Sequence, residues 1–131
     1  MKQNQVIYRL KEGYNPMIFN KDNCFIYSFP VTSGHIDNTF EFQISKSTFD
    51  ALVSNEYRFK LVYFILFHEA QKAFGTGNLK PRSFSIQEFE MYLNLVLTKS
   101  EIDLKKYCIS YLYKSNFSEK YFDSFLESVF G

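Results

Sequence analysis

The chain has 131 residues and carries 15 lysines and arginines against 14 aspartates and glutamates, a formal net charge of +1. This length is one domain's worth, enough to bury an ordinary core without disulfides or metal. The balanced charge lacks the strong basic excess typical of nucleic-acid binding, and it gives no support to contact with an anionic membrane surface.

The first third of the chain predicts a small antiparallel sheet. Residues 6–10 alternate in hydrophobicity, and residues 25–31 have an apolar side chain at every second position. Residues 38–44 alternate strictly, which is typical of a half-buried strand. Pro30 indicates an edge position or a bulge, because proline has no backbone N–H to donate. A turn-rich stretch from Gly13 contains a short apolar patch at 17–19 and is followed by a polar turn at 20–23, and no strand is assigned to this patch.

After Ser45 the apolar spacing becomes helical. Ser47, with Asp50 three residues later, fits a capping box at the start of a short helix. A long helix is expected over residues 55–74. Since residues 61–67 are all apolar, this helix has to be covered all round, and the run is too short to span a bilayer.

Three further helices complete the chain. Ser85 and Glu88 form a second capping box before a helix over 86–97, another helix begins at Ser100, and the last covers residues 118–129. The sequence therefore predicts an α+β fold, with a small N-terminal antiparallel β-sheet followed by about four to five α-helices packed on it. We expect one globular domain over residues 1–131.

The catalytic motifs that the chain suggests are incomplete. His68-Glu69 opens a zinc-protease pattern, but that pattern needs a second histidine where this chain has Lys72. His68 is therefore expected at the rim of the core, with no chemical role. The glycine-rich stretch at 75–80 follows a helix and lacks phosphate-loop spacing, so it indicates a helix end and a loop.

Neither Cys24 nor Cys108 has a second cysteine at metal or redox spacing. The polar residues 1–5 predict that no signal peptide is present, so both cysteines are expected as buried, reduced thiols in a cytoplasmic protein. We accordingly expect no metal, no cofactor and no enzymatic activity.

His35 and Asp37 lie in the loop predicted between the second and third strands, at residues 32–37. A histidine and a carboxylate two residues apart can act as an acid/base pair. Turn chemistry also accounts for Gly34 and Asp37, and contact with a partner is favoured over catalysis at this loop.

Four acidic side chains flank the expected junction between the helix over 86–97 and the helix that begins at Ser100: Glu88, Glu90, Glu101 and Asp103. Acidic residues also complement the dipole at helix starts.

The chain is 20% aromatic, with 16 Phe and 10 Tyr. Tyrosine supplies rigid, amphipathic contact area at interfaces, although AT-rich coding enriches the same residues. The acidic set and the His35 loop are the predicted partner-binding residues.

Two segments, VTSGHIDNTFEFQIS at 31–45 and EYRFKLVYFILFHE at 56–69, give the chain a resemblance to bacterial toxin-immunity proteins. These are encoded beside contact-dependent growth-inhibition toxins and other polymorphic toxins. The resemblance implies a protein that binds the C-terminal domain of its cognate toxin in the cytoplasm and blocks its active site or substrate access. It implies no direct contact with nucleic acid or membrane.

Two other classes are compatible with the same sequence. One is a small enzyme or ligand-binding domain that uses the His35 loop, and the other is a nucleic-acid-associated regulatory protein. Co-purification with the product of a neighbouring gene separates the toxin-immunity hypothesis from both.

Overall fold

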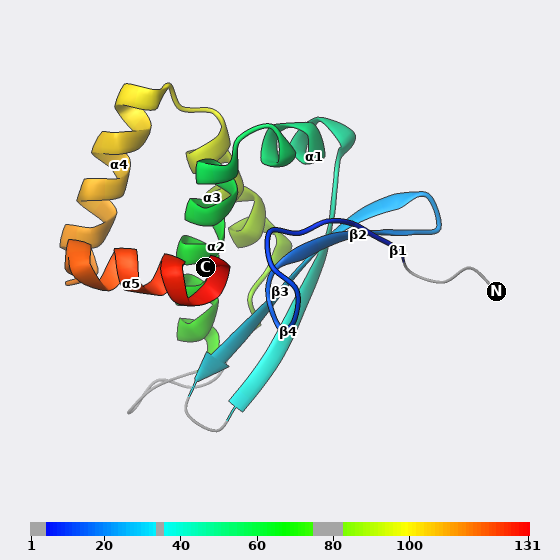
Figure 1. Ribbon diagram of the computed structural model, residues 1–131, viewed down its shortest axis with the longest axis horizontal. Helices are drawn as coiled ribbons and strands as arrows, with labels where there is room; N and C mark the ends of the chain where they lie inside the picture. Colours follow the sequence, from blue (N-terminus) through cyan, green and yellow to red (C-terminus); the bar gives the residue numbers. More distant parts are fainter. Residues whose placement is uncertain (1–4, 34–35, 75–82) are drawn as a thin grey trace.

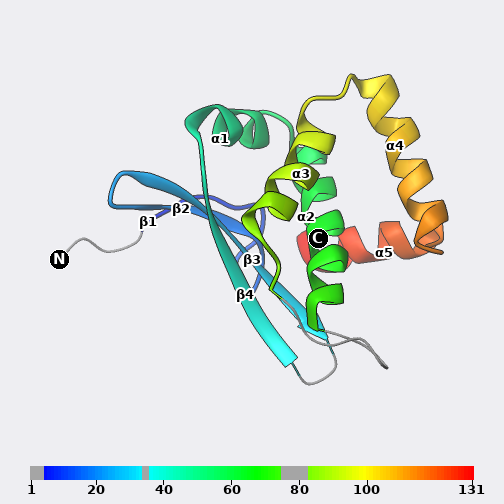
Figure 2. The same cartoon turned by 180° about the vertical axis from the view of Figure 1, so that it is seen from behind.

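The computed structural model describes residues 5–33, 36–74 and 83–131. Within these ranges the chain forms a four-stranded antiparallel sheet followed by five α-helices, so the predicted α+β fold is confirmed. The elements are β1 (Gln5–Tyr8), β2 (Met17–Lys21), β3 (Cys24–Ser33), β4 (Ile36–Ile44), α1 (Lys46–Val53), α2 (Glu56–Gln71), η1 (Lys72–Phe74), α3 (Ile86–Leu97), α4 (Glu101–Lys114) and α5 (Glu119–Phe130). Figures 1 and 2 show α2 and α3 beside the sheet, and α4 at the end of the molecule far from the strands.

The strands run in the order β1-β2-β3-β4, and the alternation in β3 decides which face is buried. Tyr27 and Phe29 are fully buried and pair with Phe42 and Phe40 of β4. Phe89 of α3 stacks on Phe42, with 4.5 Å between ring centroids. The apolar side of the predicted alternation is therefore the side that α3 covers.

The apolar patch at 17–19, which is not among the predicted strands, is part of β2. Ile18 pairs with Tyr27 of β3 and is fully buried. Met17 to Phe19 are apolar in succession, so the patch lacks the two-residue period that identifies a half-buried strand. Pairing with a strand on each side, and not its own pattern, holds it in the sheet.

The β3–β4 hairpin is longer than predicted. Thr32 pairs with Asp37, and Ser33 pairs with Ile36, so most of the expected loop at 32–37 is strand. At the other end of the sheet, β1 covers residues 5–8 instead of 6–10.

The helices begin at side chains that accept hydrogen bonds from the backbone. Ser85, Ser100 and Ser118 each accept from the N–H three residues later, as predicted for the starts of α3, α4 and α5. For α1 the predicted start was wrong: Ser45 is the cap and accepts from Thr48 N–H at 3.1 Å. Ser47 lies inside the helix because Ser45, directly after β4, already satisfies the first free donors.

Helix α2 is the centre of the core, as predicted. Residues 61–66 are all at most 3% exposed, and only Phe67 of the apolar run is half-buried. The chain continues from α2 as a single 3-10 turn over Lys72–Phe74. Within the described ranges, no helix combines the length and the apolar character that crossing a membrane requires.

Candidate functional site

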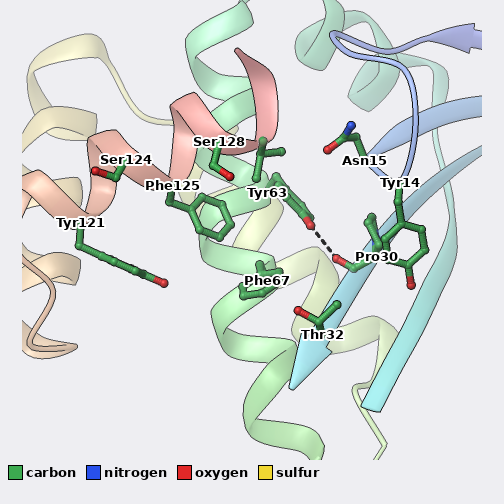
Figure 3. Close-up of a pocket in the computed structure, with 11 residues that line it drawn as sticks. Tyr14, Asn15, Pro30, Thr32, Tyr63, Phe67, Tyr121, Ser124, Phe125 and Ser128 are labelled. Atoms are coloured by element: carbon green, nitrogen blue, oxygen red, sulfur yellow. Dashed lines mark hydrogen bonds between the residues drawn. The ribbon is translucent and has the colours of Figure 1, made fainter. Parts of the chain in front are cut away.

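A groove of about 410 Å³ lies where the β1–β2 loop, β3, α2 and α5 meet. We call this the aromatic groove, because five aromatic rings of the described residues line it: Tyr14, Tyr63, Phe67, Tyr121 and Phe125. Asn15, Thr32, Ser124 and Ser128 add polar groups, and none of the described lining residues carries a charge. Figure 3 shows Tyr14 and Tyr121 on opposite sides of the groove. They are 58% and 40% exposed, so both present ring surface to an incoming molecule.

The floor of the groove is held by a bond between α2 and the sheet. Strand β2 begins at Met17, opposite Ser28, so β3 continues beyond Ser28 with one edge unpaired by β2. Tyr63 donates its hydroxyl to the carbonyl of Pro30 at 2.6 Å (Figure 3). Pro30 has no N–H, so this edge presents one donor fewer to a foreign strand. Burial raises the pKa of Tyr63, which keeps the phenol protonated as the donor.

His68 fixes the tyrosine on the other side of the groove. Its Nδ1 lies 2.7 Å from the carbonyl oxygen of Phe64, which can only accept, so Nδ1 carries the proton. In the neutral ring Nε2 is then an acceptor, and the hydroxyl of Tyr121 donates to it at 2.7 Å. His68 is 6% exposed. It is buried more deeply than the rim position expected from the sequence, and both of its nitrogens are used.

We predict that His68 makes the protein less stable in mild acid. Burial lowers the pKa of His68 from its ordinary 6.5, and the bond to Phe64 and the charge of Glu69 offset this only in part, while Lys72 adds to it. The unfolded chain therefore binds the proton more readily. Stability is complete above the unfolded pKa and is lost as pH falls from about 6.5 toward the lower folded pKa.

Urea denaturation of the wild type and of His68→Gln at several pH values between roughly 5 and 7.5 measures this effect. The wild type should lose free energy of unfolding as pH falls, and the variant should lose less. His35 is present in both proteins, so its titration cancels in the comparison. Equal slopes would show that His68 is not held neutral in the folded protein.

Behind the groove, Glu69 joins three helices. Tyr92 of α3 donates to Oε1 at 2.7 Å, Tyr111 of α4 donates to Oε2 at 2.8 Å, and Lys72 Nζ lies 2.7 Å from Oε2. Burial by itself raises the pKa of Glu69, but the bonds from Lys72, Tyr92 and Tyr111 together outweigh it, so the pKa lies below its ordinary value. The carboxylate is ionised, and each of its oxygens accepts at least one bond. We call these four residues the Glu69 cluster.

The Glu69 cluster is not among the sites predicted from the sequence. Lys72, which breaks the zinc-protease pattern, is the ion-pair partner of the glutamate in that pattern. The two tyrosines come from positions 23 and 42 residues further along the chain. Helical spacing indicates which helix they belong to, but it gives no sign that they meet at one carboxylate.

The predicted acidic residues fall into two separate groups. Glu88 lies in the first turn of α3, where Ser85 donates to it at 3.3 Å, and Glu90 follows it. Glu101 and Asp103 lie together in the first turn of α4, beyond the other end of α3. Nine residues of helix separate Glu88 from the end of α3, about 14 Å along the axis. The four side chains do not form one patch, and their part in binding stays a prediction.

The hairpin candidates are described only in part. Asp37 is exposed on β4, opposite Thr32, which lines the aromatic groove. His35 and the glycine-rich stretch at 75–80 lie outside the described residues. Cys108 is buried as expected, whereas Cys24 is only half-buried, and both are free thiols.

Among the described residues, no group of three or more His, Cys, Asp or Glu side chains is placed to hold a metal ion. The described residues of the aromatic groove offer an uncharged surface of rings and hydroxyls. No protein-family model matches the chain, and neither a curated protein nor a solved structure is similar enough to give a match.

Proposed function

We propose that this chain is a toxin-immunity protein, which binds the C-terminal domain of a cognate toxin one to one in the cytoplasm and blocks its active site or substrate access. The observation that carries the proposal is the aromatic groove, an uncharged hollow with a well-exposed tyrosine on each side. Tyrosines that offer a flat ring and a hydroxyl are typical centres of protein interfaces.

The two side chains best suited to acid–base chemistry, His68 and Glu69, are both engaged in hydrogen bonds, and this favours binding over catalysis. His68 uses both ring nitrogens in bonds to Phe64 and Tyr121, and Glu69 accepts from three donors. A general base needs a free lone pair within reach of a substrate proton. The one lone pair of the His68 ring is taken by Tyr121, and both oxygens of Glu69 already accept bonds that hold the helices together.

The groove also indicates what kind of partner surface it accepts. Its described lining residues supply rings from the β1–β2 loop, α2 and α5, and none of them carries a charge that could pair with an ion. A desolvated charge placed there would lack a partner, which is costly. An aromatic or long aliphatic side chain of the toxin fits better, with its own polar groups bonded by Ser124, Ser128 or Asn15 at the edge.

We expect Tyr14→Ala and Tyr121→Ala each to weaken binding of the toxin domain by about 30-fold, because each removes a ring from the centre of the contact. Met91→Ala is the matched control, since Met91 is 48% exposed on α3 and does not line the groove. It should change the dissociation constant by less than about twofold. Circular dichroism and thermal melting establish that each variant is folded.

A growth assay tests the function itself. The C-terminal toxin domain encoded by the upstream gene is expressed with the wild type, with the Tyr14→Ala/Tyr121→Ala double variant, or with Met91→Ala. The wild type and the control should restore growth, and the folded double variant should not. Failure of the wild type to protect against that toxin would contradict the proposed function, whereas protection by the double variant would contradict only the groove as its site.

A further inference from the structure

Hydrogen bonds fix the direction of the Tyr121 hydroxyl at the aromatic groove. The carbonyl of Phe64 can only accept, so Nδ1 of His68 carries the proton, and Nε2 then accepts from Tyr121 at 2.7 Å. Tyr121 lines the groove, and Figure 3 shows its hydroxyl end turned toward Phe67 on α2. A phenol has a single proton to donate, and here that proton is bonded to His68. The hydroxyl therefore offers an incoming molecule a lone pair and no donor.

Two other groups of the groove also direct a donor into the protein itself. The hydroxyl of Tyr63 donates to the carbonyl of Pro30 at 2.6 Å. The Nδ2 of Asn15 donates to a carbonyl of its own loop at 2.9 Å. In both groups the side-chain oxygen remains an acceptor, whereas the hydroxyls of Ser124 and Ser128 can act either way. Among the described lining residues, the groups that the fold holds in one direction are thus acceptors toward the groove.

We propose that His68 is a positioning residue for partner binding: it makes Tyr121 an acceptor toward the groove, so the partner inserts a ring that carries a neutral hydrogen-bond donor. Tyrosine and tryptophan side chains have this chemistry, because each joins a flat apolar surface to one O–H or N–H. A neutral donor is favoured over an ammonium group, since none of the described lining residues has a negative charge. The inference rests on the proposed function and names the partner side chain at the same site.

Protonation of His68 reverses the direction of this bond. The imidazolium ring carries a proton on both nitrogens, so Nε2 donates to the oxygen of Tyr121 and the phenol proton turns away from His68. The donor of the partner then meets a donor. Binding in the groove should therefore weaken when His68 takes up a proton.

The surroundings of His68 keep it neutral at neutral pH. The titratable groups around it are Glu69 of α2, Lys72 of η1, Tyr111 and Lys114 of α4, and Tyr121 of α5. The charge of Glu69 favours the imidazolium ring, but burial outweighs it, and the pKa of His68 lies below 6.5. The state that makes Tyr121 an acceptor is therefore the one present above the pKa of His68.

Phenol and anisole test the donor requirement on the purified chain by itself. Phenol has an O–H to donate, and anisole is the same ring with that donor replaced by a methoxy group. NMR titrations at about pH 7.5 give the dissociation constant of each probe from the shifts of groove signals. The ratio of the anisole constant to the phenol constant should be about threefold to tenfold larger for the wild type than for Tyr121→Phe, which keeps the ring and loses the acceptor.

Tyr113→Phe is the matched control. Tyr113 is 83% exposed on α4 and does not line the groove, so this variant should keep the wild-type ratio. Equal ratios in the wild type and Tyr121→Phe overturn the proposal, and so does the absence of phenol binding at the groove at roughly 50 mM. Ring-nitrogen shifts of the free protein that place the proton of neutral His68 on Nε2 would also overturn it.

The pH profile separates the directing role of His68 from a structural one. In the wild type the ratio should stay constant while His68 is neutral, and it should fall toward the Tyr121→Phe value as the His68 ring signals titrate. In folded His68→Gln nothing titrates at this position, so the ratio should not depend on pH. His35 is present in both proteins. The same pH dependence in both would contradict a role of His68 in directing Tyr121.

The toxin domain encoded by the upstream gene separates this inference from the proposed function. Tyr121→Phe should weaken its binding about threefold to tenfold, which is less than the effect of Tyr121→Ala. If Tyr121→Phe binds like the wild type while Tyr121→Ala binds weakly, the groove is the site and the donor requirement is wrong. If the wild type does not bind this domain, the proposed function fails, and the ratio for phenol and anisole still decides the inference.

Discussion

Phe64→Ala should lower the free energy of unfolding by about 3 to 5 kcal/mol, through lost burial and the cavity that remains. Phe64 is fully buried at the centre of α2. Its ring meets Phe122 and Phe125 of α5 edge-on, with centroids 4.8 and 5.1 Å away. It also packs against Phe117 in the turn before α5. Removing one ring therefore weakens the attachment of the C-terminal helix to the rest of the core.

Urea denaturation measures this loss, with Met91→Ala as the control. Met91 is 48% exposed, so its truncation should cost no more than about 0.5 kcal/mol. Leu66→Ala, at another fully buried position of α2, should cost about 2 to 5 kcal/mol. If Phe64→Ala unfolds at the same urea concentration as Met91→Ala, α2 is not the centre of the core.

Glu69→Gln should cost about 3 kcal/mol at neutral pH. The substitution keeps the shape of the side chain but removes the negative charge that Lys72 and the two tyrosines bind. It also replaces one carboxylate oxygen by an NH2 group, which is a donor placed against other donors. The one oxygen of glutamine cannot replace both carboxylate oxygens, so either Tyr92 or Tyr111 then faces an amide N–H. The loss should loosen α3 or α4, since these tyrosines link those helices to Glu69 of α2.

The same substitution should change the response to acid. The folded pKa of Glu69 lies below its ordinary value of 4.5, so the unfolded chain takes up the proton first. The stability that Glu69 contributes is complete above about pH 4.5 and is lost as pH falls toward the folded pKa. Denaturation of wild type and Glu69→Gln between roughly pH 3 and 7 should show the two free energies converging in acid. Glu90→Gln, exposed on α3, is the control, and a constant difference at all pH values would contradict the ionised cluster.

The order of strands and helices could be predicted, because most elements carry their own signal. The strict alternation at 38–44 and the capping serines at Ser85, Ser100 and Ser118 are local patterns, and they mark β4 and three helix starts correctly. At α1 two serines offer the same chemistry. Ser47 fits the capping-box spacing better, but Ser45 follows β4 directly and takes the role, while Asp50 pairs with Lys46 at 3.0 Å instead.

The candidate sites could not be predicted in the same way. Tyr14 and Tyr121 lie more than 100 residues apart in the chain, and they share the aromatic groove only because α2 and α5 pack beside β3. The Glu69 cluster likewise joins three helices.

The most direct test of the proposed function is a calorimetric titration of the purified chain into the purified toxin domain encoded by the upstream gene, with the activity of that domain assayed along the same titration. We expect a stoichiometry of one to one, inhibition that is complete at equivalence, and affinity that falls at least about 30-fold in the folded Tyr14→Ala/Tyr121→Ala variant. Absence of both binding and inhibition at roughly 100 μM would contradict the proposed function.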